Sequence, residues 1–329
     1  MRQFAIFLLV SFTSLWVQFV YAISLEHSVI APLAKDSLLL DIDSKGSLIV
    51  VVGERGHILY SKNNRTWQQA NVETRSTLTN VFLLDQNTGW AVGHDAVILK
   101  TEDGSLNWSL IHQAIDEPPL LDLMFFDPLN GIAIGAYGLM YKTNNGGTSW
   151  DKTPVNIINK DILGLETNTS FDLHLNSISC ANNKRCYIAA ESGYLLRTDD
   201  AGHSWTVLKT PYEGSFFGTV CLSGDELLVF GLKGHLYRSV DSGLHWVQIE
   251  THTSEMLTAA KRLNSGDIVI TGMGGTLLIS HNNGASFAKF DLKNKNGLSS
   301  LVETENGTLY LSGEKGIEVI SIDEIQQRQ

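Results

Sequence analysis

Acidic residues recur at one fixed place in the sequence, and carboxylates are the side chains here that could do chemistry. The segments "TEDGSLNW" (101–108), "TDDAGHSW" (198–205) and "SVDSGLHW" (239–246) each place an Asp two residues after a Ser or Thr and five residues before a Trp. Paired carboxylates act as general acid and general base, or as nucleophile, in glycoside hydrolysis. The first question is therefore whether these acids form an active site or hold the fold together.

The same turn also occurs with an amide in place of the acid. "TNNGGTSW" (143–150) and "SHNNGASF" (280–287) carry Asn, and a shortened copy, "SKNNRTW", covers 61–67. Either side chain can accept hydrogen bonds from backbone N–H groups of its own turn, the glycine allows a positive φ, and the aromatic residue fills the wedge between adjacent sheets. We therefore predict structural roles for Asp103, Asn145, Asp200, Asp241, Asn282, Trp67, Trp108, Trp150, Trp205, Trp246 and Phe287.

The turns belong to a longer repeat. Glycine-containing strand pairs such as "GHDAVILKT" and "GLKGHLYRS" begin at residues 53, 93, 135, 190, 231, 272 and 313. Fifteen residues before each start stands a large apolar residue: Leu38, Leu78, Leu120, Leu175, Phe216, Leu257 and Leu298. A repeat of about 40 residues with four short strands is typical of a propeller blade. The sequence therefore predicts an all-β, seven-bladed β-propeller of four-stranded antiparallel blades.

The seventh repeat, "GEKGIEVISIDEIQQRQ", has no turn and no Trp, so it lacks an outer strand. The segment "SLEHSVIAPLA" (24–34) precedes the first inner strand and has no other assigned place. We expect this N-terminal strand to pair as the fourth strand of the last blade. Such pairing would close the ring and remove exposed sheet edges.

Composition and the N-terminus restrict the partners and the compartment. The net charge of −11 argues against nucleic acid, because phosphate binding needs a basic surface. Residues 1–22 are interpreted as a signal peptide cut after Ala22, with an uncleaved anchor as the alternative, and 23–329 as one propeller domain. We expect an exported, monomeric protein of a bacterial periplasm or thylakoid lumen, or a secreted one, that is soluble after cleavage.

Export also makes the three cysteines interpretable. In "CANNKRC", Cys180 and Cys186 flank a predicted hairpin turn that brings their thiols together, which favours a disulfide. Cys221 is then left over and is expected to be a small buried hydrophobic residue.

An enzyme is the alternative kind of function. Asp122, Asp172 and Glu213 are acids that the axial loops of a glycosidase could present. A sialidase also needs an arginine triad, whereas Arg197 and Arg238 share one register of the third strand, which favours a structural role. The ten histidines show no metal-binding spacing. We therefore expect no catalytic residue, no metal and no cofactor, and keep a sialidase-like glycoside hydrolase as the alternative.

The repeated turn resembles the Asp-box, or BNR repeat, of sialidases and other propellers, in which it is structural and lies on the outer rim. "NTGWAVGHDAVILKTEDGSLNW" together with "LNGIAIGAYGLMYKTNNGGTSW" resembles the photosystem II stability and assembly factor family, and the pattern recurs through 36–320. The resemblance implies a non-enzymatic scaffold that binds a membrane-protein complex or its assembly intermediate. A periplasmic partner of a membrane transporter is the alternative, because this chain is acidic and has a plain signal peptide where cyanobacterial members often have a lipoprotein cysteine.

One candidate binding surface is the face formed by the loops that lead into the inner strands. Eighteen residues before each strand pair stand Lys35, Arg75, Glu117, Asp172, Glu213, Ser254 and Lys295. Ring closure would make the three basic residues neighbours and place the three acids opposite, so this face is predicted to be electrically two-sided and to orient a partner. Ordinary solvated loop charges are the alternative.

The second candidate is an insertion at about 151–176, which makes the spacing between two strand pairs 55 residues. Its apolar residues include Ile157, Ile158, Ile162 and Leu163. They are expected to form either a partner-binding lip or a lid packed on the fourth blade.

Overall fold

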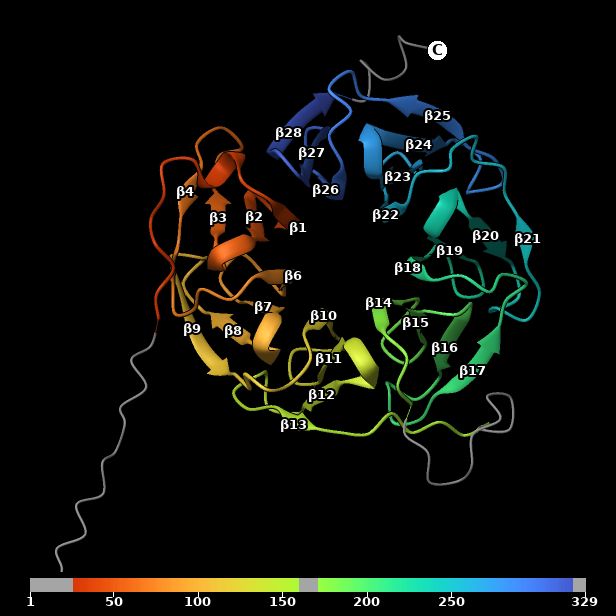
Figure 1. Cartoon of the computed structure of the whole chain (residues 1–329), viewed down its shortest axis with the longest axis horizontal. Coiled ribbons are helices and arrows are strands. Elements are labelled where there is room, and N and C mark those ends of the chain that lie inside the picture. The colour runs from red at the N-terminus through yellow and green to blue at the C-terminus, as the bar shows by residue number, and fades with distance from the viewer. Residues whose placement is uncertain (1–25, 160–170, 322–329) are drawn as a thin grey trace, which may run out of the picture.

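Seven β-sheets lie around a common axis in the computed structural model, which describes residues 26–159 and 171–321 (Figure 1). The all-β class, the seven blades and their four-stranded antiparallel plan are confirmed. The signal peptide predicted at 1–22 lies outside the described residues. Within them, no helix is long and apolar enough to cross a membrane.

Each blade is built from strands that are consecutive in the sequence, numbered outward from the axis. Blade 1 contains β1 (Leu39–Lys45), β2 (Leu48–Gly53), β3 (Ile58–Ser61) and β4 (Gln68–Gln69). Blade 2 contains β6 (Leu78–Leu83), β7 (Gly89–Gly93), β8 (Ile98–Thr101) and β9 (Asn107–His112), with β5 (Asn71–Val72) added in parallel to β9. Blade 3 contains β10 (Leu120–Phe125), β11 (Gly131–Gly135), β12 (Met140–Thr143) and β13 (Asp151–Lys152). Blade 4 contains β14 (Leu175–Cys180), β15 (Cys186–Ala190), β16 (Tyr194–Thr198) and β17 (Thr206–Lys209).

The remaining blades continue the same order. Blade 5 contains β18 (Phe216–Cys221), β19 (Leu227–Gly231), β20 (Leu236–Ser239) and β21 (Val247–Gln248). Blade 6 contains β22 (Leu257–Arg262), β23 (Ile268–Gly272), β24 (Thr276–Ser280) and β25 (Ala288–Asp291). Blade 7 contains β26 (Leu298–Glu303), β27 (Thr308–Gly313) and β28 (Gly316–Ser321). Short 3-10 turns precede β1 or join second to third strands: η1 (Ala34–Asp36), η2 (Glu54–Gly56), η3 (His94–Ala96), η4 (Ala136–Gly138), η6 (Leu232–Gly234) and η7 (Met273–Gly275).

The second strand of every blade is buried along most of its length because adjacent blades cover both of its faces. All five residues of β7 are buried, as are those of β11 and β15. This double coverage explains why these strands read as continuous apolar runs without alternation. At the end of β7, Gly93 lies against the carbonyl of Thr77, where a Cβ would clash, so this repeated glycine is required by the close approach of the first strand.

The inner-strand register differs from the prediction in blade 1. Leu39, and not Leu38, pairs with Gly53 and is buried at the position that Leu78 and Leu120 occupy opposite Gly93 and Gly135. Blade 1 is one residue shorter between its inner strand and its glycine than the other blades. A count of fifteen residues from each glycine therefore misplaces the first strand by one.

The predicted closure of the last blade by the N-terminal strand is wrong. The described part of blade 7 has three strands, and the N-terminal segment lies against blades 1 and 2. The Ser28 amide donates to the carbonyl of Val72 at 2.9 Å, and the Ala31 amide donates to the Gln69 side chain at 2.9 Å. The physical reason is that the backbone N–H groups of this segment already find acceptors in Val72 and Gln69, so the segment runs beside blade 1 as a linker.

Blades 1 and 7 are held together instead by side-chain packing. Ala34 and Leu39 share an apolar cluster with Val302 and Tyr310 of blade 7. The Tyr310 ring also lies 6.1 Å from that of Trp67, and its hydroxyl donates to the backbone carbonyl of Asn64. The ring therefore closes through side-chain contacts between blade 1 and the described three strands of blade 7.

Candidate partner-binding face

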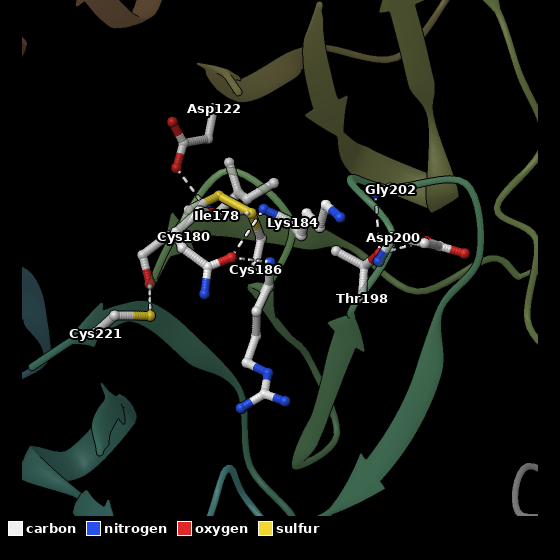
Figure 2. The surroundings of a disulfide bond; sticks show 12 residues. Asp122, Ile178, Cys180, Lys184, Cys186, Thr198, Asp200, Gly202 and Cys221 are labelled. Carbon is white, nitrogen blue, oxygen red and sulfur yellow. Dashed lines mark hydrogen bonds between the residues drawn. A yellow bond between two sulfur atoms is a disulfide. The ribbon is translucent and has the colours of Figure 1, made fainter. Parts of the chain in front are cut away.

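The recurring Asp side chains accept hydrogen bonds from groups of their own turns. In blade 4, Asp200 accepts the Thr198 hydroxyl at 2.7 Å, and the Gly202 amide donates to Thr198 Oγ1 (Figure 2). Asp200 also accepts the Ser204 amide at 2.9 Å. Asn145 and Asn282 accept hydrogen bonds in the same way. A turn that works equally with an amide and with a carboxylate needs an acceptor and not a proton donor.

The ionisation of these acids fits the same role. The backbone N–H of His245 lowers the pKa of Asp241 to about 2, with further help from the His245 side chain. At Asp103 and Asp200 burial raises the pKa, but hydrogen bonds from the turn outweigh it and the net pKa is lowered. A carboxylate held ionised in this way is a poor general acid at neutral pH.

The aromatic residues of the turns pack against the preceding blade. Trp108 belongs to a cluster with Val50 and Tyr60 of blade 1, and Trp205 to one with Ile132 and Met140 of blade 3. The other four pack likewise or lie partly buried at such seams: Trp67, Trp150, Trp246 and Phe287.

Basic residues of the third strands tie neighbouring turns together on the same face. Arg197 donates to the carbonyl of Ser242 in the next blade's turn at 3.2 Å, and Arg238 donates to that of Asn283 at 3.2 Å. Lys142 donates in the same manner to Gly202. Their shared register therefore serves contacts between blades, in line with the predicted structural role of Arg197 and Arg238.

The face on the opposite side is formed by the loops that lead into the inner strands, and we call it the leading face. Arg75, Glu117, Asp172, Glu213 and Lys295 each lie three residues before an inner strand and share this face. In blade 1 the equivalent position is Asp36, because of the register change, and the predicted Lys35 lies 3.7 Å from it as an ion pair.

Several charges of the leading face are engaged locally. Lys152 contacts both carboxylate oxygens of Glu117 at 2.6 and 2.7 Å, and Lys295 contacts Asp291 at 2.7 Å. The Arg75 side chain donates through Nε to the carbonyl of His27 at 2.9 Å. These pairs leave the proposed two-sided field weaker than the formal charges imply.

The leading face is hollowed beside Arg75. A groove of about 870 Å³ lies between the N-terminal segment and the outer part of blade 2, lined among others by Glu26, Arg75, Asp95, His112 and Ile115. Burial lowers the pKa of His112, so this imidazole is neutral at physiological pH. The groove combines an exposed aliphatic side chain with charged groups of both signs.

The blade-four insertion begins by packing on its own blade. Ile157 is buried and forms a parallel bridge with Trp205, and the Ile158 amide donates to the Trp205 carbonyl at 3.0 Å. The Ile158 side chain remains 65% exposed. Ile162 and Leu163 lie outside the described residues. The described part therefore extends the outer edge of blade 4 and leaves one aliphatic side chain for a contact.

A group of acids lies at the axis, and of its members the sequence singled out only Asp122. Asp41 and Asp43 of β1 and Asp122 of β10 line an axial channel of about 480 Å³, to which all seven inner strands contribute. Burial raises the pKa of both Asp41 and Asp122 to about 7. The channel lining includes neither Asp172 nor Glu213, so the three acids considered for a glycosidase are not brought together there.

The axial acids also have structural partners. Asp41 accepts the Val81 amide at 2.9 Å, and Asp43 accepts the Leu83 amide at 2.8 Å, both from blade 2. The sequence "DIDSK" (41–45) carries the signal that could have located them, since alternate residues of an inner strand face the axis. Across 26–159 and 171–321, no group of three His, Cys, Asp or Glu residues is placed to hold a metal ion.

Blade 4 contains a disulfide between Cys180 and Cys186, at paired positions of β14 and β15 (Figure 2). The hairpin turn between them is closed by Asn182, whose side chain accepts the amides of Lys184 and Arg185. Cys221 keeps a free thiol beside the Ser179 hydroxyl, and burial raises its pKa to about 11. The free thiol is thus neutral and unreactive at physiological pH.

The fold and its turns define a seven-bladed Asp-box β-propeller whose recurring acids stabilise the blades. The sequence profile of the family described as "Photosynthesis system II assembly factor YCF48" matches residues 105–324. The chain belongs to this family.

Solved structures and a curated relative agree with this assignment. YCF48 from Cyanidioschyzon merolae superimposes with a TM-score of 0.71 at 17% identity, over 91% of this chain and 98% of that one. YCF48 bound to D1 peptide gives a TM-score of 0.65 at 16% identity, over 89% and 93% of the two chains. At these identities the likeness shows the fold. The photosystem II assembly lipoprotein Ycf48 of Synechococcus sp. (strain CC9902) is 24% identical over 175 residues, 51% of this chain and 48% of that protein, so the match spans about half of its length.

Proposed function

We propose that this protein is an exported, non-enzymatic scaffold that binds a membrane-protein complex or its assembly intermediate, in the manner of photosystem II assembly factors. The observation that carries the proposal is the family match over residues 105–324, which includes blades 3 to 7 in full. A structure of a YCF48 protein with a D1 peptide supports a peptide segment of a membrane protein as the kind of partner.

The leading face is the surface that suits this role. Loops around a propeller axis are free to vary while the sheets stay fixed, so binding residues gather there. The groove beside Arg75 offers charged groups and the exposed Ile115 on this face, whereas the opposite face is occupied by turns whose acids are already hydrogen-bonded. The exposed Ile158 lies at the outer edge of blade 4, beside Trp205 of one of those turns. We assign partner contact on the leading face to Arg75, Glu117, Asp172, Glu213 and Lys295. At the outer edge of blade 4 we assign it to Ile158, which Ile162 and Leu163 of the insertion follow in sequence.

The test is recovery of the partner from detergent-solubilised membranes of the source organism, with the affinity-tagged full chain as bait. Subunits of photosystem II in the eluate, lost when Arg75→Glu and Ile158→Glu are combined, would support the proposal. Lys62→Glu is a matched control because Lys62 is an exposed residue of a blade 1 turn on the opposite face. Recovery of transporter subunits alone would replace the photosystem by a transporter partner. Turnover of sialosides by the purified protein would overturn the non-enzymatic role.

A further inference from the structure

Among the described residues, nothing covers the outermost strand of blade 7 in the way that other third strands are covered. The third strands of blades 1, 2, 3, 5 and 6 are buried at every residue or at all but one. In β28, by contrast, Ile317 and Ile320 are half-buried and Val319 is 53% exposed. The strand therefore presents apolar side chains that a fourth strand would cover.

Within residues 26–159 and 171–321, the backbone of β28 is also open on that side. In complete blades, one residue of the third strand pairs with the residue directly before the repeated glycine of the second strand. The carbonyl of that third-strand residue accepts an N–H from the chain that enters or leaves the fourth strand. Such carbonyls belong to Ile58, Met140 and Leu236, which accept the amides of Ala70, Thr153 and Ile249 at 2.9 Å. Ile317 holds the equivalent place in blade 7, opposite Ser312.

The orientation of Ile317 fixes that of its neighbours. In an antiparallel strand the N–H and C=O of one residue point to the same side, and the side alternates along the strand. The backbone groups of Ile317 and Val319 therefore point away from β27. Among the described residues no strand pairs with this edge over Gly316–Ile320, whereas Ser321 at its end is engaged.

The usual protection of an exposed edge is absent from β28. Natural edge strands carry lysine, proline or a bulge that prevents pairing with another chain. β28 contains none of these, and its one charged residue, Glu318, is held by Asn294 at 2.8 Å and by Asn296. The N-terminal segment, which could have covered the edge, is hydrogen-bonded beside blade 1.

We propose that the outer edge of β28 is a binding site for an extended segment of a partner protein, which adds to blade 7 as its fourth strand. Main-chain hydrogen bonds to Ile317 and Val319 would supply affinity, and alternate apolar residues of the segment would cover the side chains of β28. The segment is neutral or basic and comes from a different protein, since two copies that each carry a net charge of −11 repel one another. The inference rests on the proposed function in that it specifies the form of the partner's bound segment.

The experiment measures backbone amide hydrogen exchange of the full chain with and without a synthetic peptide. The peptide carries residues 281–291 of this protein, "HNNGASFAKFD", which include the turn and fourth strand of blade 6, and a scrambled peptide is the control. We expect the amides of Ile317 and Val319 to exchange quickly in the free protein and at least about tenfold more slowly with the peptide.

Two variants test the mechanism. Val319→Pro removes an N–H that faces away from β27, so the blade keeps its internal hydrogen bonds but should lose peptide binding. Val319→Ala retains that N–H and should bind the peptide nearly as well as the unmodified protein. Unchanged melting temperature in both variants is the check that the blade is intact.

Three outcomes would overturn the proposal. Slow exchange of Ile317 and Val319 in the free protein would mean that the chain itself fills the edge. A dimer in analytical ultracentrifugation that disappears with Val319→Pro would assign the edge to a second copy. If the peptide does not slow the amide exchange of Ile317 and Val319, no strand adds to this edge. Peptide binding without recovery of a membrane complex would instead preserve the site while removing the proposed function.

Discussion

The carboxylate of Asp122 in blade 3 accepts the backbone N–H of Ile178 in blade 4 at 2.7 Å (Figure 2). The same link joins Asp41 to Val81 between blades 1 and 2. The residues at this position in blades 5, 6 and 7 are Gly218, Ala259 and Ser300. Carboxylates at this position therefore link adjacent blades near the axis on the side of blades 1 to 4. Blades 5, 6 and 7 have only short side chains there.

Loss of the Asp122 acceptor should weaken this seam. We expect Asp122→Ala to lower the free energy of unfolding by about 1–2 kcal/mol, because the Ile178 amide loses its partner in a narrow channel. Asp122→Asn keeps an acceptor oxygen and should cost clearly less. Urea unfolding followed by tryptophan fluorescence measures both, and equal losses in the two variants would contradict the assigned hydrogen bond.

The axial acids also predict a pH dependence of stability. Because the pKa of Asp41 and Asp122 is raised to about 7 in the folded protein, the folded state holds more protons than the unfolded state between about pH 4 and 7. The free energy of unfolding should therefore fall as pH rises through this window, by at most about 1.4 kcal/mol per pH unit for each group. A pH series of urea unfolding curves measures it.

The double variant Asp41→Asn with Asp122→Asn is the control for that dependence and should reduce the slope between pH 4 and 7. A smaller slope should remain, because burial also raises the pKa of Asp43. Asp241, whose pKa is lowered to about 2, acts in the opposite direction and only below this window, since its stabilisation is present above pH 4 and lost on acidification. An unchanged slope in the double variant would assign the dependence to other groups.

Substitution of a turn acid separates a structural from a catalytic role. Asp200→Ala should lower the free energy of unfolding by about 1–2 kcal/mol, because the Thr198 hydroxyl and Ser204 amide lose their acceptor. Asp200→Asn should cost less than half of that, as Asn145 performs the same task in blade 3. Differential scanning calorimetry compares them, and an Asn variant as unstable as the Ala variant would show that the charge itself is needed.

Charge reversal tests the leading face. Arg75→Glu combined with Lys295→Glu should weaken binding of the recovered membrane complex at low salt, with a smaller effect at high salt because screening shortens the range of the field. Surface plasmon resonance with the immobilised complex gives the association rates. An unchanged association rate at both salt concentrations would mean that these are ordinary solvated charges.

Removal of the disulfide should be tolerated. Replacement of Cys180 and Cys186 by Ser is expected to cost about 2 kcal/mol, since a short loop restricts the unfolded chain only modestly. In the folded double-Ser variant, Cys221 should still react slowly with Ellman's reagent, because its thiol is largely buried. Rapid reaction in the folded variant would show that the disulfide keeps blade 5 closed.

Much of the fold was readable because each blade repeats local chemistry: a glycine, a short strand pair, an acceptor turn and an aromatic residue. The register of Leu39 was missed because blade 1 is one residue shorter, which a fixed count does not detect. The place of Ser28 was missed because its partner, the Val72 carbonyl, is a backbone group that no pattern marks. Asp41 and Asp122 are 81 residues apart in the sequence (122 − 41), yet both line the axial channel. Their proximity follows from the closure of the ring, which the spacing of residues does not reveal.

Since every sheet consists of strands adjacent in the sequence, each one has all its hydrogen-bonding partners as soon as its own stretch of roughly 40 residues has left the ribosome or a translocation pore. Nascent blades can then stack one by one on those already formed. Only the interface between blades 1 and 7, where Leu39 packs near Val302, must wait for the end of synthesis. We therefore expect this interface to separate first when the folded protein is pulled apart by force.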